Sequence, residues 1–240
     1  ESGTFGLCRS LTTIDIPDSV AAIADDAFTG CKALQSFTLS PNHPYFFLAD
    51  DALCRTADST LLLYPNAREP RTYRIPDGIT AISAYAFYDC DLLESVVVPD
   101  SVTQLPARAF SGCSALASVS LPDSLTEIGT AAFSGCSALT GIRIPAAITE
   151  IINHTFSGCT SLATLEIPDS VTKIGDYAFF GCTSLTSIAI PDSVTAIGNG
   201  AFSNCTALTL TVTPDSYAAE YAKANNIPYT YPDANDWLNN

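Results

Sequence analysis

The sequence is poor in the residues on which several common kinds of site depend. Of its 240 residues, none is Met, one is Trp and two are His, and the 10 Lys and Arg are outnumbered by 25 Asp and Glu. The formal charge of −15 repels nucleic-acid phosphates and anionic lipid surfaces. No apolar run approaches the roughly 18 residues that a membrane-spanning helix needs. We therefore expect no nucleic-acid partner and no membrane span.

Motifs that mark an enzyme or a cofactor site are also missing. The sequence has no glycine-rich phosphate loop, no HExxH motif and no CxxC pair. His43 and His154 have no matching nucleophile. We therefore expect no catalytic residues, no cofactor and no metal, and an enzyme would need a catalytic domain outside these residues.

The chain also lacks a signal peptide, and residues 4–10 have the pattern of the tail of a preceding repeat. These features predict a fragment of a longer precursor, in which an export signal would lie outside the fragment.

What the sequence does contain is an internal repeat of about 23 residues. Residues 162–184 and 185–207 share the pattern L-x-x-I-x-I-P-D-S-V-T-x-I-G-x-x-A-F-x-x-C-x-x. Every step between repeats has this same length except that from Leu34 to Pro70, which is 36, so one repeat carries 13 extra residues. The repeats begin at Leu11, Leu34, Pro70, Leu93, Leu116, Leu139, Leu162, Leu185 and Leu208. Such a period indicates a solenoid whose stacked units share a continuous core.

Each repeated position has a physical interpretation. In L-x-x-I-x-I the two Ile alternate with an exposed residue, as in a short strand with one buried face, and the Pro ends that strand. Asp and Ser then favour a turn. At the Gly position one repeat has Pro106, whose ring fixes φ at about −65°, so a short extended segment is expected there. The largest core side chains, each preceded by a predicted helical turn, are Phe5, Phe28, Phe87, Phe110, Phe133, Phe156, Phe179 and Phe202.

Eight of the nine cysteines occupy one repeat position: Cys8, Cys31, Cys90, Cys113, Cys136, Cys159, Cys182 and Cys205. Stacked coils place such thiols in a parallel column about 4.8 Å apart, whereas a disulfide needs converging Cβ atoms about 3.8 Å apart. We expect buried, reduced thiols, with a disulfide framework as the alternative. Cys54 lies off this column and is the candidate for a reactive thiol.

The long repeat and the C-terminus depart from the pattern. Apolar runs at residues 45–48 and 61–64 predict a β-hairpin, which either covers the core of the neighbouring coil, the favoured interpretation, or carries function. At the other end, Thr213 as N-cap and Pro214 as first residue predict a helix that ends near Asn225. We expect its face with Tyr217, Ala218, Tyr221 and Ala222 to seal the last coil, and residues 227–231 to form a closing strand.

The IPDSVTxIGxxAFxxC blocks at residues 167–182 and 190–205, the insertion ending in LLLYP and the segment PDSYAAEYAKANNIPY resemble the BspA-like leucine-rich repeats of bacterial surface proteins. The resemblance covers nearly the whole chain. It implies a secreted or surface-anchored protein and, in some members, adhesion to host proteins. It carries over no ligand residues.

The repeat and this resemblance together predict an α/β, strand-rich leucine-rich-repeat solenoid. Its right-handed coils would form a parallel sheet on the concave face and short extended or 3-10 segments on the convex face, with a C-terminal capping helix. The expected organisation is a solenoid over residues 1–213, with an enlarged coil at 34–69, followed by a cap and tail over residues 214–240.

The exposed strand positions form the candidate binding surface. Arg74 and Arg143 are the two cations of its central column and the best candidates for contacts. The full candidate set is Arg74, Arg143, Glu166 and Asp15, with Tyr45, Phe46 and Phe47 of the insertion. Alternatively, both arginines only offset nearby acids such as Asp15 and Glu166. A column of aspartates after the strands is explained by turn capping without a bound ion.

These observations predict a non-enzymatic secreted or cell-surface module, monomeric, that binds or adheres to a protein or glycan through the repeat surface. The alternative is a structural spacer with no ligand of its own.

Overall fold

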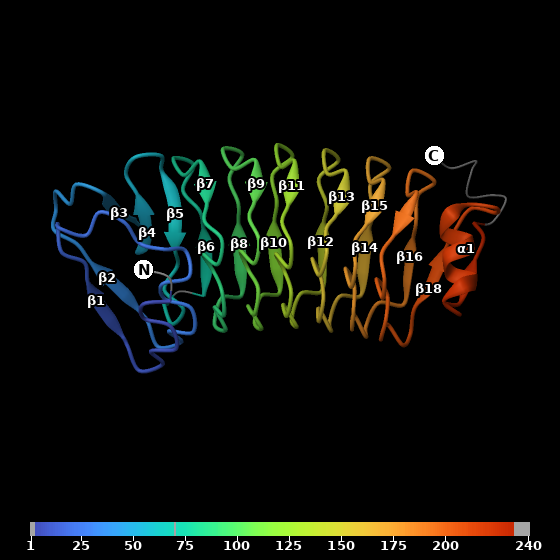
Figure 1. The fold of residues 1–240 in the computed structure, drawn as a ribbon, viewed down its shortest axis with the longest axis horizontal. Coiled ribbons are helices and arrows are strands. Elements are labelled where there is room, and N and C mark those ends of the chain that lie inside the picture. The colour runs from blue at the N-terminus through green and yellow to red at the C-terminus, as the bar shows by residue number, and fades with distance from the viewer. Residues whose placement is uncertain (1–2, 70, 233–240) are drawn as a thin grey trace.

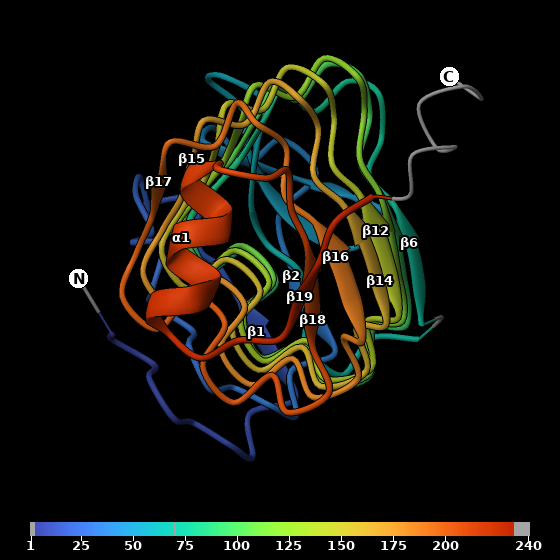
Figure 2. The ribbon, with the colours of Figure 1, turned by 90° about the vertical axis from the view of Figure 1, so that its right-hand side faces the viewer.

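The computed structural model describes residues 3–69 and 71–232, and it is a β-solenoid of about nine turns with one C-terminal helix (Figure 1). The expected leucine-rich-repeat solenoid is confirmed. Seen along its axis, successive coils superimpose and the helix lies across one end (Figure 2). Pro70, where one repeat is expected to begin, and residues 233–240 of the predicted tail lie outside the described residues.

Three-residue strands, one per coil, form what we call the front sheet. The strands are β1 (Thr13–Asp15), β2 (Ser36–Thr38), β6 (Thr72–Arg74), β8 (Ser95–Val97), β10 (Ser118–Ser120), β12 (Gly141–Arg143), β14 (Thr164–Glu166), β16 (Ser187–Ala189) and β18 (Thr209–Thr211). Paired strands are parallel and in register, so that Val96 stands opposite Tyr73 on one side and Val119 on the other. The central residue of each strand points inward because its neighbours alternate to the outside.

Two-residue strands, one in each of the coils that begin at residues 70 to 185, form a second ladder. It consists of β7 (Ala81–Ile82), β9 (Gln104–Leu105), β11 (Glu127–Ile128), β13 (Glu150–Ile151), β15 (Lys173–Ile174) and β17 (Ala196–Ile197). This is the extended segment expected at the Gly position, and close packing explains why Gly is common there. A Cβ on Gly129 would come within 2.6 Å of the Pro106 carbonyl carbon in the preceding coil.

A tight turn, not the expected helical turn, precedes each buried Phe. Its key residue has a left-handed backbone, with φ from 54° to 62° at Tyr85, Arg108, Ala131, His154 and Tyr177. The sequence contains little sign of this, because these residue types rarely adopt positive φ. The conformation recurs because four of these residues, all but Tyr85, donate their N–H to the next coil, as His154 does to the Asp176 carbonyl at 2.9 Å.

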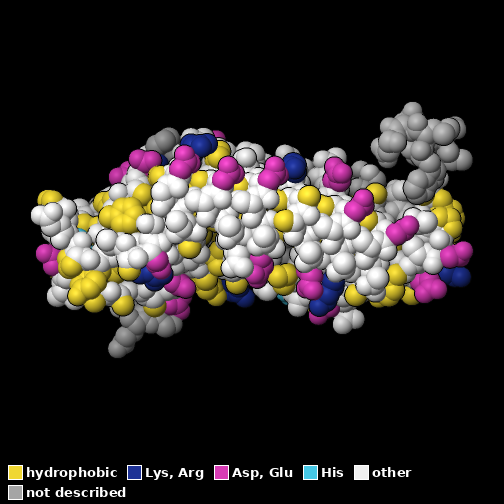
Figure 3. All heavy atoms as spheres, turned by 90° about the horizontal axis from the view of Figure 1, so that it is seen from above, with side chains coloured by type: hydrophobic (Ala, Val, Ile, Leu, Met, Phe, Trp, Pro, Cys, Tyr) yellow, Lys and Arg dark blue, Asp and Glu magenta, His cyan; other side chains and the backbone are white. Residues whose placement is uncertain are grey.

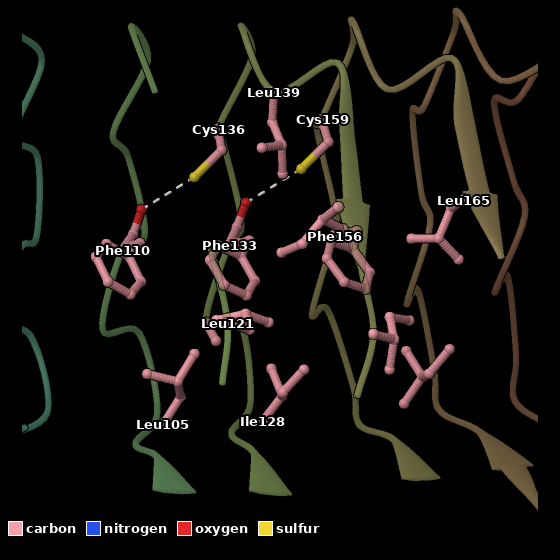
Figure 4. Packing of buried hydrophobic residues seen from close by; sticks show 14 of the residues in the cluster. Leu105, Phe110, Leu121, Ile128, Phe133, Cys136, Leu139, Phe156, Cys159 and Leu165 are labelled. Carbon is pink, nitrogen blue, oxygen red and sulfur yellow. Dashed lines mark hydrogen bonds between the residues drawn. The ribbon is translucent and has the colours of Figure 1, made fainter. Parts of the chain in front are cut away.

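The buried phenylalanines stack ring on ring along the axis (Figure 4). The ring centroids of Phe110 and Phe133 are 5.5 Å apart and those of Phe133 and Phe156 are 5.7 Å apart, with interplanar angles of 1° and 3°. Tyr64 of the long coil continues the stack, 5.3 Å from Phe87. The stack therefore passes from the regular repeats into the irregular one.

The cysteine column lies beside the stack, and all nine thiols are free. Each column thiol from Cys31 onward donates to the carbonyl of an aromatic residue 26 positions earlier, as Cys136 does to Phe110 at 3.1 Å and Cys159 to Phe133 at 3.2 Å (Figure 4). The expected disulfide-free column is confirmed, but not every thiol is buried, because Cys8 is exposed in the first coil and Cys205 is half-buried in the last.

The prediction that Cys54 is a reactive thiol is wrong. Cys54 is fully buried, and burial raises its pKa to about 12. Its thiolate is therefore scarce near neutral pH, and a reagent has no access to it.

The insertion forms three strands, β3 (Phe46–Ala49), β4 (Ala52–Arg55) and β5 (Thr60–Leu63). Strand β4 pairs antiparallel with both β3 and β5, and β5 then pairs parallel with β7. Both apolar runs are strands, as expected, but they do not form a hairpin with each other, because β4 lies between them. Both faces are buried: Leu53 and Leu62 join the N-terminal core with Phe28, whereas Cys54 and Leu61 join the main core. The insertion therefore packs against both cores, and a functional role for it stays a prediction.

The helix α1 (Tyr217–Ala224) and the strand β19 (Tyr229–Thr230) close the C-terminal end. The N-cap is Ser216, which accepts a hydrogen bond from the Ala219 N–H, so the prediction of Thr213 is wrong. Tyr217 is exposed instead of sealing the coil, and the buried contacts come from Ala218, Ala219 and Ala222. The strand β19 pairs with β18, as expected of a closing strand.

Candidate functional site

The outward side chains of the front sheet line a shallow trough. Over β6 to β12 it encloses 420 Å³ between Arg74 and Arg143, with Val97 and Ser120 on its floor. One side is formed by the turns that follow the strands, which carry Asp77, Asp100 and Asp123. We call this part the front groove.

Acidic side chains follow one another along the length of the array, with basic ones among them (Figure 3). Arg74 pairs with Asp77 at 3.4 Å, and Arg143 pairs with Asp123 at 2.5 Å. The hydrogen bond from Arg143 to Asp123 raises the pKa of Arg143. Both pairs are highly exposed, and solvent and salt screen pairs of this kind strongly. A ligand can therefore displace the aspartates at little cost.

A second depression of 810 Å³ continues the trough over β12 to β18. Arg143 lines both parts, and Glu166 stands opposite it in the strand register. Beyond Glu166 the lining is small and uncharged, with Ser187, Ala189 and Thr211. The trough thus presents charged side chains from Arg74 to Glu166 and uncharged ones toward the C-terminal end.

The structure brings together only some of the candidate residues. Arg74, Arg143 and Glu166 share the trough, whereas Asp15 lies on β1, where it accepts a hydrogen bond from Thr38 at 2.8 Å, and lines neither depression. The two arginines do pair with acids, as the alternative interpretation held, but with Asp77 and Asp123 in place of Asp15 and Glu166. Their role in binding stays a prediction.

The aromatic residues of the insertion differ in exposure. Tyr45 is 44% exposed and Phe47 is partly buried against the main core, but Phe46 is only 2% exposed. Phe46 packs in the N-terminal core beside His43, so it does not contact a partner from this position. Of the three, Tyr45 alone keeps a substantial exposed surface.

The two histidines have structural environments. His43 is buried, and its ring nitrogens lie within hydrogen-bond distance of the Pro17 carbonyl, at 3.1 Å, and of the Phe46 N–H, at 3.2 Å. His154 stacks on Tyr177 with ring centroids 5.2 Å apart. Among the described residues no group of three His, Cys, Asp or Glu side chains is arranged to hold a metal ion.

One surface feature was not anticipated from the sequence. A notch of 260 Å³ lies between the turns of the second coil and of the coil after the insertion. Its lining is Leu7, Asp26, Thr29, Gly30, Tyr85, Tyr88 and Asp89. Tyr85 and Tyr88 have other residue types in most of the other coils, and this departure was the available signal.

No helix within residues 3–69 and 71–232 is both long enough and apolar enough to cross a membrane.

Known proteins similar to this chain were found by family and by structure. A profile of the BspA type leucine rich repeat region matches residues 1–47 and 73–216, in six copies. A comparison with curated proteins gave no match.

Several solved structures are similar to the chain. A leucine rich cell surface protein from Faecalibacterium prausnitzii is 35% identical, with a TM-score of 0.61, over 95% of this chain and 50% of its own. A leucine-rich repeat protein from Eubacterium ventriosum is 25% identical, with a TM-score of 0.67, over 81% of this chain and 59% of its own. A T. pallidum leucine rich repeat protein is 27% identical, with a TM-score of 0.59, over 80% of this chain and 97% of its own. The chain spans about half the length of the first of these relatives.

Proposed function

The chain belongs to the BspA-type leucine-rich repeat family, and on that premise we propose that it is a non-enzymatic binding module of a bacterial cell-surface or secreted protein. It recognises a protein or glycan through the trough of the front sheet. The family and its solenoid fold are typically non-catalytic, and a relative is described as a cell surface protein. These points support an extracellular role without naming a ligand.

The observation that carries the proposal is the placement of Arg74 and Arg143 at the two ends of the front groove. Three strand steps separate them, which corresponds to about 14 Å. Each guanidinium is held by a single exposed aspartate. A ligand that carries an acidic group or several hydroxyl groups can replace these aspartates and gain bidentate contacts from the arginines.

The test is a binding screen of the immobilised protein against purified extracellular host proteins and a glycan array. Each ligand found is measured again with the double variant Arg74→Ser/Arg143→Ser. We expect the double variant to weaken binding by about tenfold or more, because it leaves charged groups of the ligand without their partners in the interface. The matched control is Lys173→Ser/Lys223→Ser, which removes the same charge from the second ladder and α1 and should leave binding within about twofold.

The insertion is tested by Tyr45→Ser and not by deletion, because removal of β3 to β5 would open both cores. Unaltered affinity in the double variant, with the same melting temperature as the parent, would place the binding surface elsewhere. A screen that yields no ligand at all would favour the structural spacer.

A further inference from the structure

The notch between Gly30 and Asp89 arises because the coil of the insertion is recessed. In regular coils the turn after each buried Phe is hydrogen-bonded to the equivalent turn of the next coil. The Gly112 N–H, for example, donates to the Ser134 carbonyl at 2.8 Å. The corresponding residue of the inserted coil, Asn66, is only 4% exposed and donates its side-chain N–H to the Tyr88 carbonyl at 2.8 Å. The turns on either side therefore face one another across a gap.

Lys32 crosses this gap beside the notch. Its ammonium pairs with Asp91 at 2.6 Å, but it lies 4.0 Å from the Asp89 carboxylate. Asp89 is partly shielded from water, and this desolvation, more than any neighbouring charge, raises its pKa. Within the described residues, Lys32 is the cation that forms an ion pair with Asp89, and it lies at the outer limit of ion-pair distance.

Aromatic rings form another wall of the notch. Tyr85 and Tyr88 meet edge to face, with centroids 5.5 Å apart. The guanidinium of Arg108 lies over the Tyr85 ring at 5.8 Å, so this ring already attracts one cation. Within the described residues neither hydroxyl group has a hydrogen-bond partner, which leaves both available to a guest.

The remaining walls complete a site with polar and apolar parts. Asp26 stands across from Asp89 and accepts a hydrogen bond from the Gly3 N–H at 3.2 Å. Leu7 is 68% exposed and lies against Gly30, where a Cβ would come within 2.8 Å of its side chain. Two carboxylates, two tyrosines and one leucine therefore surround the same 260 Å³.

We propose that this notch binds the basic side chain of a partner protein, an arginine or a lysine. A planar guanidinium or an ammonium gains an ion pair with Asp89 and cation–π contact with the tyrosines, while its aliphatic stem covers Leu7. The volume suits the end of one side chain and not a folded surface. The net charge of −15 also draws a cationic partner toward the protein.

The notch and the front groove are separate surfaces with no residue in common. The proposal therefore does not rest on the proposed function, and either can fail alone.

The experiment is an NMR titration with two short peptides, acetyl-Gly-Arg-Gly-amide and its citrulline counterpart, which has nearly the same shape without the charge. We expect millimolar binding of the arginine peptide that perturbs the ring signals of Tyr85 and Tyr88, and citrulline binding at least about tenfold weaker. Raising the salt concentration should weaken the arginine peptide further, because the notch is open to solvent.

Variants locate the site. Asp89→Asn should weaken the arginine peptide by about fivefold or more, and Tyr85→Leu by about two- to fivefold, the equivalent of an exposed cation–π contact. The matched control, Asp192→Asn, removes the same charge from an exposed turn far along the chain and should leave affinity within about twofold. Unchanged thermal unfolding shows that each variant is folded. Equal binding of the citrulline peptide, or an unaltered affinity of Asp89→Asn, would overturn the proposal.

Discussion

The hydrophobic core is built differently in two parts of the molecule. These are the regular coils from β6 to β18 and the N-terminal region that contains the insertion. In the regular coils the buried Phe rings stack on their equivalents one repeat away, and a single core runs through these coils. In the N-terminal region the strands β3 to β5 separate two cores and pack against both. The array accommodates the longer repeat because the insertion still places Tyr64 in the aromatic stack and pairs its strand β5 with β7 of the second ladder.

The junction between these regions has its own contacts. Strands β2 and β6 of the front sheet do not pair with each other, and the Tyr73 hydroxyl of β6 instead donates to the Ala49 carbonyl at the end of β3, at 2.9 Å. Arg68 lies over the rings of Tyr64 and Tyr73, at 5.7 Å and 5.8 Å, and pairs with Asp51 at 3.0 Å. One cation thus joins the aromatic stack to the insertion.

Among the substitutions considered, the largest loss of unfolding free energy is expected in the regular coils. Phe133→Ala removes a fully buried ring from the middle of the stack and should lower the free energy of unfolding by about 3–5 kcal/mol. The control is Ser120→Ala, at an exposed position of the same coil, which should change it by no more than about 0.5 kcal/mol. Denaturant unfolding measures both. Equal midpoints for the two variants would show that the inside and outside of the coil are wrongly assigned.

A substitution in the insertion is expected to lower the unfolding free energy somewhat less and to destabilise only the coils near it. Leu53→Ala should cost about 2–5 kcal/mol in the N-terminal core, because the residue is fully buried there. Since coils contact mainly their neighbours, amide hydrogen exchange should accelerate in β1 to β5 and stay unchanged in β14 to β18. Uniform acceleration along the chain would contradict the separation of the two cores.

The thiols provide a comparison of burial in the two regions. Burial raises the pKa to about 12 both for Cys54 of the insertion and for Cys159 of the column, from an ordinary value of 9.0. The unfolded chain loses these protons near pH 9 and the folded chain near pH 12. The contribution to stability is therefore complete below pH 9 and is lost as the pH rises toward 12, by up to about 1.4 kcal/mol per pH unit for each thiol.

The measurement is denaturant unfolding from about pH 8 to 10.5, with Cys54→Ala and Cys159→Ala each expected to reduce the slope by a similar amount. At about pH 8, a thiol reagent should modify Cys8 in the native protein, Cys205 more slowly and the other thiols only after denaturation. Fast native modification of Cys54 would show that the insertion opens independently of the array.

The smallest loss of unfolding free energy is expected at the junction between the insertion and the regular coils. Arg68→Ala should cost about 0.5–2 kcal/mol, since the guanidinium is largely buried over two rings. Arg55→Ala is the matched control, because its pair with Asp58 at 2.8 Å is exposed and should contribute less than about 1 kcal/mol. If thermal unfolding showed Arg55→Ala to be the more damaging, the junction would not depend on Arg68.

Much of the fold could be predicted from the sequence because a repeat offers the same evidence many times. The strand positions, the Phe column and the disulfide-free cysteine column recur in each of the regular repeats from Pro70 to Ala207. Single features were predicted less well. Ser216 as the helix cap, the burial of Phe46 and the strand β4 each occur once, so no second copy was available to correct a wrong interpretation.

The sequence by itself determined the period, the residues that face inward and the class of fold, because the alternation of apolar and polar residues selects one way to bury them. The tertiary structure alone decided the rest. Coil stacking imposed the left-handed turn at residues such as Arg108 and His154, and the recessed coil opened the notch beside Tyr85. These features depend on how a coil meets the next one, and that contact joins residues whose proximity no local sequence pattern records.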